Sequence, residues 1–147
     1  MLLQEIVNVM GGNAVVKGAV EYPSDLIALT QEGLPITALK NLQNELGLTN
    51  REVTQLMGLS ESTLIRRYKA VNAHQRLTRD ETDKLIHVSK VVARGMEVFE
   101  SEEKLELWLR SEVRALGNKR PLYLLWSSLC REQILEILIR IEYGIYS

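Results

Sequence analysis

The chain has 147 residues, of which 46% are hydrophobic and 25% charged, a composition typical of a folded globular protein. This length suits one domain, or two small helical modules that share a core, and excludes a large enzyme or a repeat array. The net charge is only −1, but six basic and two acidic residues give residues 51–79 a charge of +4. Such a patch indicates a surface that faces phosphate, with a merely solvated basic face as the alternative.

Cysteine content and hydropathy indicate the compartment. The single Cys130 cannot form an internal disulfide, which is typical of a reducing environment. The run "MLLQEIVNVMGG" lacks the positive start and the long apolar core of a secretory signal. No stretch approaches the ~20 apolar residues that span a bilayer. We therefore expect a cytoplasmic protein with no membrane partner.

The first predicted elements are short. Residues 1–23 contain "GGNAVVKG", which has no helical period and predicts a loose or extended arm. Ser24 is placed to cap a short helix that ends near Gly33. Pro35 suits the first turn of the next helix, and Gly47 can close that helix in a left-handed conformation.

Two capping boxes mark the helices that follow. "TNRE" begins at Thr49 and "TRDE" begins at Thr78, and in each box the Thr and Glu side chains satisfy backbone amides at a helix start. The second box opens a long helix with one buried face, expected to end near Glu100. That face carries Leu85, Val88, Val92, Met96 and Phe99.

The rest of the chain also has helical patterns. Ser101 is expected to start a helix, Gly117 and Pro121 frame the next turn, and a final helix carries Ile134 and Leu138. The patterns predict roughly seven or eight helices and no strand. The predicted fold class is therefore all-α.

The basic stretch "LTNREVTQLMGLSESTLIRRYKA" has the layout of a helix-turn-helix. A capped helix of about two turns meets Gly58, which permits the positive φ of a tight turn, and Ser60 can cap a second helix that begins at Glu61. Four apolar residues are placed to close the small core between these helices: Val53, Met57, Leu59 and Leu64.

A helix-turn-helix places the N-terminal side chains of its second helix against base edges in the major groove. Ser62 and Thr63 are positioned for base contacts, and Arg66, Arg67 and Lys69 for phosphates or a guanine edge. The predicted DNA-binding residues are Ser60, Glu61, Ser62, Thr63, Arg66, Arg67 and Lys69. The alternative is a helical hairpin with a charged outer face.

The C-terminal half carries a specific resemblance. Residues 76–147 contain "RLTRDETDKL", "ARGMEVF", "WL", "LGNKRPLYLL" and "RIEYGIYS". With these segments the region resembles the toxin-binding domain of the Xre/MbcA/ParS-type antitoxins, the partners of RES-domain toxins. The family tends to have two glycines where this chain has Gly117 and Asn118, and a glycine near Cys130.

A looser resemblance covers the N-terminal half. The segment "EGLPITALKNLQNELGLTNREVTQLMGLSESTLIRR" is similar to the Xre-type DNA-binding part of the same family. The expected organisation is an N-terminal arm (1–23), a helix-turn-helix DNA-binding region (24–75) and a helical toxin-binding domain (76–147).

The resemblance implies a role for the apolar C-terminus. RES toxins resemble ADP-ribosyltransferases and consume NAD, and their antitoxins block them directly, with the C-terminal end near the NAD site. Tyrosine rings can stack in a nucleotide pocket, and Gly144 lets the tail turn sharply out of the last helix. The expected toxin-binding residues are Phe99, Trp126, Tyr143, Gly144, Ile145, Tyr146 and Ser147. The alternative is a tail that folds back onto the core of the protein.

No enzyme is expected. His74 and His87 have no second His or Cys at metal-ligand spacing, and no phosphate-binding glycine loop is present. We expect no catalytic residue, metal or cofactor. The expected partners are a RES-domain toxin and operator DNA, bound by a homodimer within a larger hetero-oligomer that represses its own operon. The alternative is a free-standing dimeric helix-turn-helix transcriptional regulator.

Overall fold

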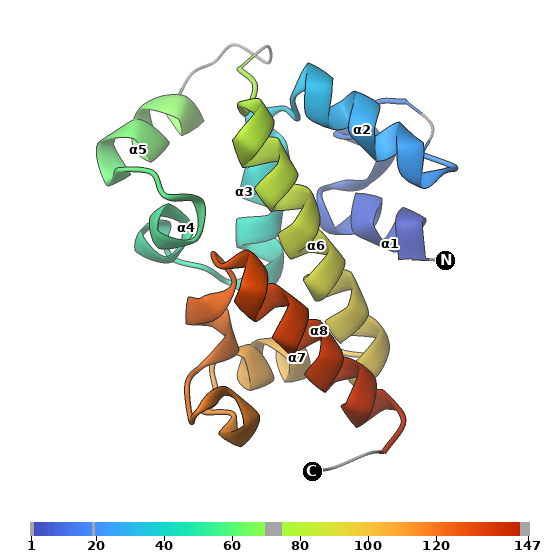
Figure 1. Ribbon diagram of the computed structural model, residues 1–147. Coiled ribbons are helices and arrows are strands. Elements are labelled where there is room, and N and C mark those ends of the chain that lie inside the picture. Colours follow the sequence, from blue (N-terminus) through green and yellow to red (C-terminus); the bar gives the residue numbers. More distant parts are fainter. Residues whose placement is uncertain (1, 19, 70–74, 145–147) are drawn as a thin grey trace.

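The computed structural model describes residues 2–18, 20–69 and 75–144 and is all-helical over these residues (Figure 1). The α-helices are α1 (Leu2–Val9), α2 (Pro23–Glu32), α3 (Ile36–Leu46), α4 (Asn50–Met57), α5 (Glu61–Lys69), α6 (Arg79–Phe99), α7 (Glu102–Leu109) and α8 (Ser128–Glu142). Three short 3-10 turns complete the list: η1 (Gly12–Ala14), η2 (Arg114–Leu116) and η3 (Pro121–Leu124). The predicted all-α fold class is confirmed.

The N-terminal segment is not a loose arm, so that prediction is wrong. Helix α1 packs against α6 and α3, and its residues Ile6, Val7 and Val9 are buried. Met10 and Val16 continue this contact, each fully buried. The apolar face of α1 lies N-terminal to the glycine-rich segment that suggested an arm. Burial of these side chains stabilises a helix too short to persist alone.

The two short helices that follow have the expected ends with one exception. Helix α2 ends before Gly33, and α3 lies between Pro35 and Gly47. Ser24 does not cap α2: the Asp25 carboxylate accepts hydrogen bonds from the Glu21 and Tyr22 amides instead. Pro23 is the first helical residue, a position where proline loses no hydrogen bond.

The helix-turn-helix has the predicted boundaries. Thr49 and Glu52 form the capping box of α4, Gly58 adopts φ 71° at its end, and α5 starts at Glu61. Val53, Met57 and Leu64 are buried between these helices and their neighbours, and Leu59 packs partly against them.

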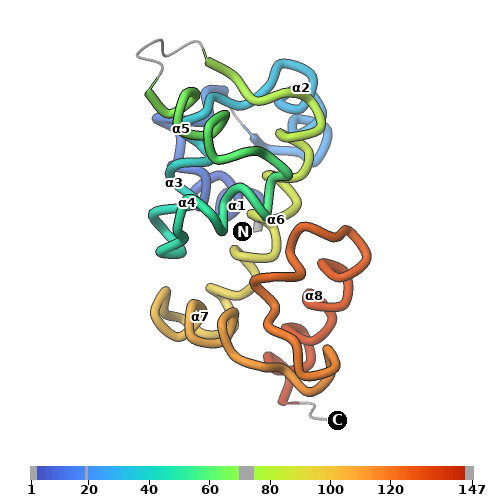
Figure 2. The backbone as a smooth tube through the Cα atoms, turned by 90° about the vertical axis from the view of Figure 1, so that its left-hand side faces the viewer, coloured from blue at the N-terminus to red at the C-terminus, as the bar shows by residue number. Residues whose placement is uncertain are grey.

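Helix α6 is the longest helix and contacts both halves of the protein. It packs against α1, α2, α4, α7 and α8 (Figure 2), and Glu5 and Val9 of α1 line a cleft with Ala93 and Met96 in its C-terminal half. Buried residues cover much of its circumference: Thr82, Leu85, Ile86, Val88, Ser89, Val91, Val92, Ala93 and Gly95. The helix ends at Phe99, as the sequence predicted.

The C-terminal part folds back beside α6. Ser101 caps α7 through the Lys104 amide, and Ser127 caps α8 through the Cys130 amide. Asn118 adopts the left-handed φ of 63°, which Asn tolerates better than most residues, so the turn forms without a second glycine. Among the described residues, no helix is long and apolar enough to cross a membrane.

Close contact between α6 and α7 requires a glycine at position 95. A methyl group there would collide with the Leu105 side chain, which is 1% exposed and has little room to move. We expect Gly95→Ala to cost about 1–3 kcal/mol from overpacking, offset in part by the better helix propensity of Ala, about 1 kcal/mol. Chemical denaturation measures this loss. Lys90→Ala, at an exposed site on the same helix, is the control and should change stability by less than about 0.5 kcal/mol. A Gly95→Ala variant as stable as the control would contradict this packing.

Candidate functional site

Three hydroxyl groups lie at the N-terminus of α5. The Ser60 hydroxyl accepts a hydrogen bond from the Thr63 amide (3.1 Å) and donates one to the Thr63 hydroxyl (2.8 Å). The Ser62 hydroxyl lies 3.2 Å from the Ser60 oxygen. Ser60 and Ser62 are exposed and Thr63 is half-buried. These groups can donate to or accept from a phosphate or a base edge at the helix end where a recognition helix makes its contacts.

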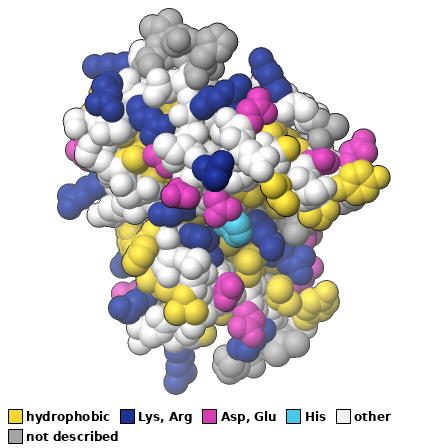
Figure 3. Space-filling view, turned by 45° about the horizontal axis from the view of Figure 1, so that its top comes forward, with side chains coloured by type: hydrophobic (Ala, Val, Ile, Leu, Met, Phe, Trp, Pro, Cys, Tyr) yellow, Lys and Arg dark blue, Asp and Glu magenta, His cyan; other side chains and the backbone are white. Residues whose placement is uncertain are grey.

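Exposed cations accompany these hydroxyls. Arg66 and Lys69 are exposed on α5, and Lys and Arg side chains gather over this end of the molecule (Figure 3). Arg51 and Gln55 are exposed on α4, the helix that crosses the DNA backbone in a helix-turn-helix. These two residues were not among the predicted DNA-binding residues, although neither occupies a buried position of α4.

Arg67 is not a DNA contact, so its prediction is wrong. The residue is 8% exposed, because position 67 lies one turn after the buried Leu64 and faces the core. Its guanidinium forms an ion pair with Glu81 (2.9 Å) and donates to the Arg76 carbonyl (3.0 Å). Burial raises the pKa of Glu81, but the hydrogen bonds from Arg67 and Thr78 outweigh it and lower that pKa. Arg67 holds α5 against α6.

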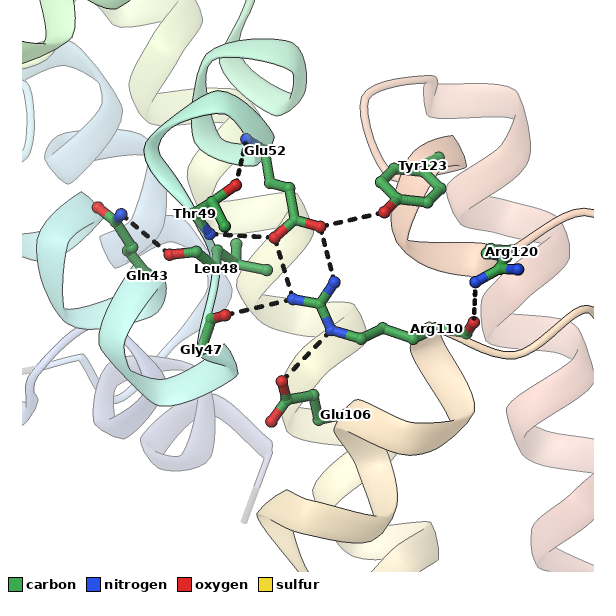
Figure 4. A network of polar contacts seen from close by, with 9 residues as sticks. All are labelled: Gln43, Gly47, Leu48, Thr49, Glu52, Glu106, Arg110, Arg120 and Tyr123. Atoms are coloured by element: carbon green, nitrogen blue, oxygen red, sulfur yellow. Dashed lines mark hydrogen bonds and ion pairs between the residues drawn. The ribbon is translucent and has the colours of Figure 1, made fainter.

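A second arginine joins α4 to the C-terminal part (Figure 4). Arg110, directly after α7, donates from both terminal nitrogens to the two carboxylate oxygens of Glu52, at 2.7 and 3.0 Å. The same guanidinium donates to the Gly47 carbonyl (3.2 Å) and to Glu106 (3.3 Å). The Tyr123 hydroxyl donates to Glu52 at 3.2 Å. We call Glu52, Arg110 and Tyr123 the junction network.

The electrostatics of the junction network follow from this geometry. Glu52 keeps its capping role, since its carboxylate accepts from the Thr49 amide at 3.0 Å. The hydrogen bonds from Arg110, with smaller contributions from Thr49 and Tyr123, lower the pKa of Glu52 to about 2. The Glu52 carboxylate in turn raises the pKa of Arg110. No local pattern indicates this pair, because its partners are 58 residues apart in the sequence.

A like-charge pair lies nearby. Glu45, on α3, is half-buried and faces Glu102 in the first turn of α7. Burial, followed by the hydrogen bond and the charge of Glu102, raises the pKa of Glu45 to about 7. The junction between the two halves therefore combines one tight opposite-charge pair, Glu52 with Arg110, and one pair of neighbouring carboxylates, Glu45 with Glu102.

The C-terminal part exposes large apolar side chains. Trp126 is 56% exposed, and Leu129 and Tyr143 are each 68% exposed. Leu129, Ile139 and Tyr143 share one face of α8, because their spacing keeps them within about 80° around the helix axis. The exposed apolar set consists of Leu107, Tyr123, Trp126, Leu129, Ile139 and Tyr143. Leu129 lies in the first turn of α8, on its outer face.

The predicted toxin-binding residues have different environments. Phe99 is half-buried: its ring lies 5.6 Å from that of Trp108, and it packs partly against the protein's own core. Trp126 and Tyr143 are exposed, and Gly144 has the positive φ expected of it, 68°. Ile145, Tyr146 and Ser147 lie outside the described residues.

The described His87 and Cys130 do not belong to a metal site. Among residues 2–18, 20–69 and 75–144, no group of three His, Cys, Asp or Glu side chains can hold a metal ion. His87 is exposed and its Nδ1 lies 2.8 Å from the Asp83 carbonyl, while Cys130 is a half-buried free thiol. His74 lies outside the described residues.

Comparisons with known proteins match both halves of the chain. The family model of the antitoxin Xre-like helix-turn-helix domain matches residues 25–90, and that of the antitoxin Xre/MbcA/ParS C-terminal toxin-binding domain matches residues 94–144. A curated relative, "Antitoxin Xre" of Photorhabdus laumondii subsp. laumondii, is 25% identical over 133 residues, which are 87% of this chain and 88% of the relative.

The fold also matches a solved structure. A chain in the crystal structure of the M. tuberculosis MbcT-MbcA toxin-antitoxin complex superposes with a TM-score of 0.52 at 20% identity. The match covers 82% of this chain and 97% of that chain. At this identity the likeness supports the fold and nothing finer.

The lowered pKa of Glu52 predicts a pH-dependent contribution to stability. A carboxylate whose pKa is depressed on folding stabilises the protein above its unfolded pKa, about 4.5 here, and loses this effect as the pH falls toward 2. At pH 7 we expect Glu52→Gln to lower the free energy of unfolding by about 2 kcal/mol. The difference from wild type should shrink between pH 4.5 and 2. Denaturation at a series of pH values measures it, with Glu103→Gln, at an exposed site on α7, as the control. A pH-independent difference would contradict the ion pair.

Proposed function

The chain belongs to the Xre/MbcA/ParS family of antitoxins, and from this premise we propose that its cognate toxin is a RES-domain enzyme that consumes NAD. An antitoxin of this family binds its toxin through the C-terminal domain, here residues 94–144. We further propose that the C-terminal tail closes the active site of the toxin and that the helix-turn-helix represses the operon of the antitoxin itself.

The observation that carries this proposal is the exposed apolar set. Its six members all lie within the stretch matched by the toxin-binding domain, whereas Tyr22, Ile27 and Ile65 are the exposed large apolar residues elsewhere in the described residues. Exposed Trp and Tyr side chains are the kind of anchor that dominates protein interfaces. Trp126 and the outer face of α8 thus supply the main toxin-binding surface.

The tail proposal rests on the end of α8. Tyr143 is exposed at the end of α8, and Gly144 has the positive φ with which a chain can turn out of a helix. Residues 145–147 add an isoleucine, a second tyrosine and the terminal serine. Aromatic rings that stack and hydroxyls that hydrogen-bond suit a pocket shaped for a nucleotide.

The DNA proposal rests on the geometry of α4 and α5. The exposed groups at the start of α5 and the cations Arg66 and Lys69 match the contacts of a recognition helix. Two such helices in a homodimer would match a two-fold symmetric operator. The match to a toxin-binding domain disfavours the alternative of a free-standing regulator whose C-terminal helices only dimerise.

The DNA proposal predicts the effect of removing two exposed cations. Arg66→Ala with Lys69→Ala should weaken binding to the DNA upstream of its own gene. Each bound chain loses two phosphate contacts, so for a dimer on its site the slope of the logarithm of affinity against that of salt concentration should fall in magnitude by about four. Fluorescence anisotropy over a salt series measures both, and native mass spectrometry should find two chains per site. Arg114→Ala with Lys104→Ala, exposed cations in the C-terminal part, is the matched control. An unchanged slope would exclude α5 as the DNA-binding helix.

The tail proposal predicts that binding and inhibition separate. Replacing residues 143–147 with a Gly-Ser sequence of equal length removes the aromatic and apolar groups but leaves α8 and Trp126. The variant should still co-purify with the RES-domain toxin, because the main anchors lie outside the tail. NAD loss and growth arrest should nevertheless return in cells that express both proteins. Full protection by this variant would show that the tail does not inhibit the toxin.

A further inference from the structure

Both capping-box glutamates bind a distant arginine. Glu81, at the start of α6, pairs with Arg67 of α5, and Glu52, at the start of α4, pairs with Arg110. The first pair joins α5 of the helix-turn-helix to the start of α6. The second pair joins α4 to the toxin-binding domain, because Arg110 lies within residues 94–144. The two helices of the motif are thus held by different parts of the protein.

The geometry of the junction network restricts the position of α4. The Glu52–Arg110 contact is bidentate, so it restricts orientation as well as distance. Arg110 also donates to the Gly47 carbonyl just before α4, and Glu52 is the most buried member, with 11% of its side chain exposed. A narrow cleft beside it is lined by Glu52 and Gln55 of α4 and by Tyr123 and Trp126 of the C-terminal part.

We propose that Arg110 and Tyr123 are positioning residues for operator binding: through Glu52 they hold α4, and with it the recognition helix, in the orientation that DNA requires. This inference rests on the proposed function, since it assumes that the helix-turn-helix binds DNA. Neither residue belongs to the predicted DNA-binding surface. Their effect comes from the orientation of α4. Because only the short turn at Gly58 separates α4 from α5, a change in the orientation of α4 also changes that of α5.

The same contacts connect DNA binding with toxin binding. Tyr123 is 47% exposed and belongs to the exposed apolar set, so a toxin that covers this set also covers the junction network. Exclusion of water strengthens charged hydrogen bonds. Toxin binding should therefore hold α4 more firmly and raise operator affinity. By linkage, the operator then raises toxin affinity by the same factor.

The test compares specific with non-specific DNA binding. Arg110→Gln and Tyr123→Phe are measured on the upstream DNA of its own gene and on unrelated DNA of equal length. Arg110→Gln should lose about tenfold in operator affinity and Tyr123→Phe about threefold, while affinity for unrelated DNA stays unchanged. Arg110→Lys keeps the charge and should recover part of the loss. Arg114→Gln, exposed on the same segment, is the control and should have no effect.

The outcomes separate positioning from simple loss of structure. Partial unfolding would lower the affinities for operator DNA and for unrelated DNA equally, and that result would overturn the proposal. A ratio of these two affinities that stays at the wild-type value in Arg110→Gln and Tyr123→Phe would also overturn it. Tyr123→Phe changes a single hydroxyl, so it remains informative if Arg110→Gln does not fold. If the wild type does not bind the upstream DNA, the proposed function fails instead.

A second experiment, with the toxin added, tests the connection between toxin binding and DNA binding. Saturation of the wild type with its RES-domain toxin should raise operator affinity about fivefold, within the usual range of coupling between two sites. In Tyr123→Phe, measured at saturating toxin, the increase should fall to less than about twofold. An operator affinity that does not respond to toxin in the wild type would overturn the connection between the two sites.

Discussion

The burial of α6 is the constraint on which the rest of this structure depends. A helix with buried residues around much of its circumference must be covered from several sides, and here the cover comes from α1, α2, α7 and α8. Helices of both halves contribute buried residues to the core around it. The N-terminal segment is helical for this reason, because without α1 the side chains of α6 that face it would be exposed to water. Helix α6 therefore connects the helix-turn-helix part with the C-terminal toxin-binding domain.

Polar contacts add orientation to this apolar core. Burial is non-directional and leaves the angle of α4 and α5 open to small changes. Two charged pairs restrict it: Arg67 with Glu81, and Arg110 with Glu52. In each pair the glutamate also caps a helix, so one carboxylate satisfies backbone amides and a distant guanidinium together. Each arrangement links the start of a helix to a segment far away in the sequence.

The two functional surfaces differ in chemistry as well as in place. The start of α5 presents hydroxyls and cations, which suit a polyanion, whereas the outer face of α8 presents Trp126, Leu129 and Tyr143, which suit a protein partner. They lie at opposite ends of the molecule, with α5 near the upper end and α8 at the lower end in Figure 2. The junction network joins α4 to the C-terminal part and so lies between these two surfaces (Figure 4).

Local hydrogen bonding and periodicity were enough to predict the capping boxes at Thr49 and Thr78, the turn at Gly58 and most helix ends. Their physical causes lie within four residues in the sequence, and the family resemblance of residues 76–147 rests on contiguous motifs. Tertiary structure alone decided three other points: that α1 is a helix, that Arg67 faces inward, and that Arg110 binds Glu52. Their causes are contacts with distant residues, as in the 14-residue separation of Arg67 from Glu81 and the 58-residue separation of Arg110 from Glu52. An arginine in the sequence carries the same charge whether it faces DNA or a buried carboxylate, and only the packing of α5 against α6 distinguishes the two.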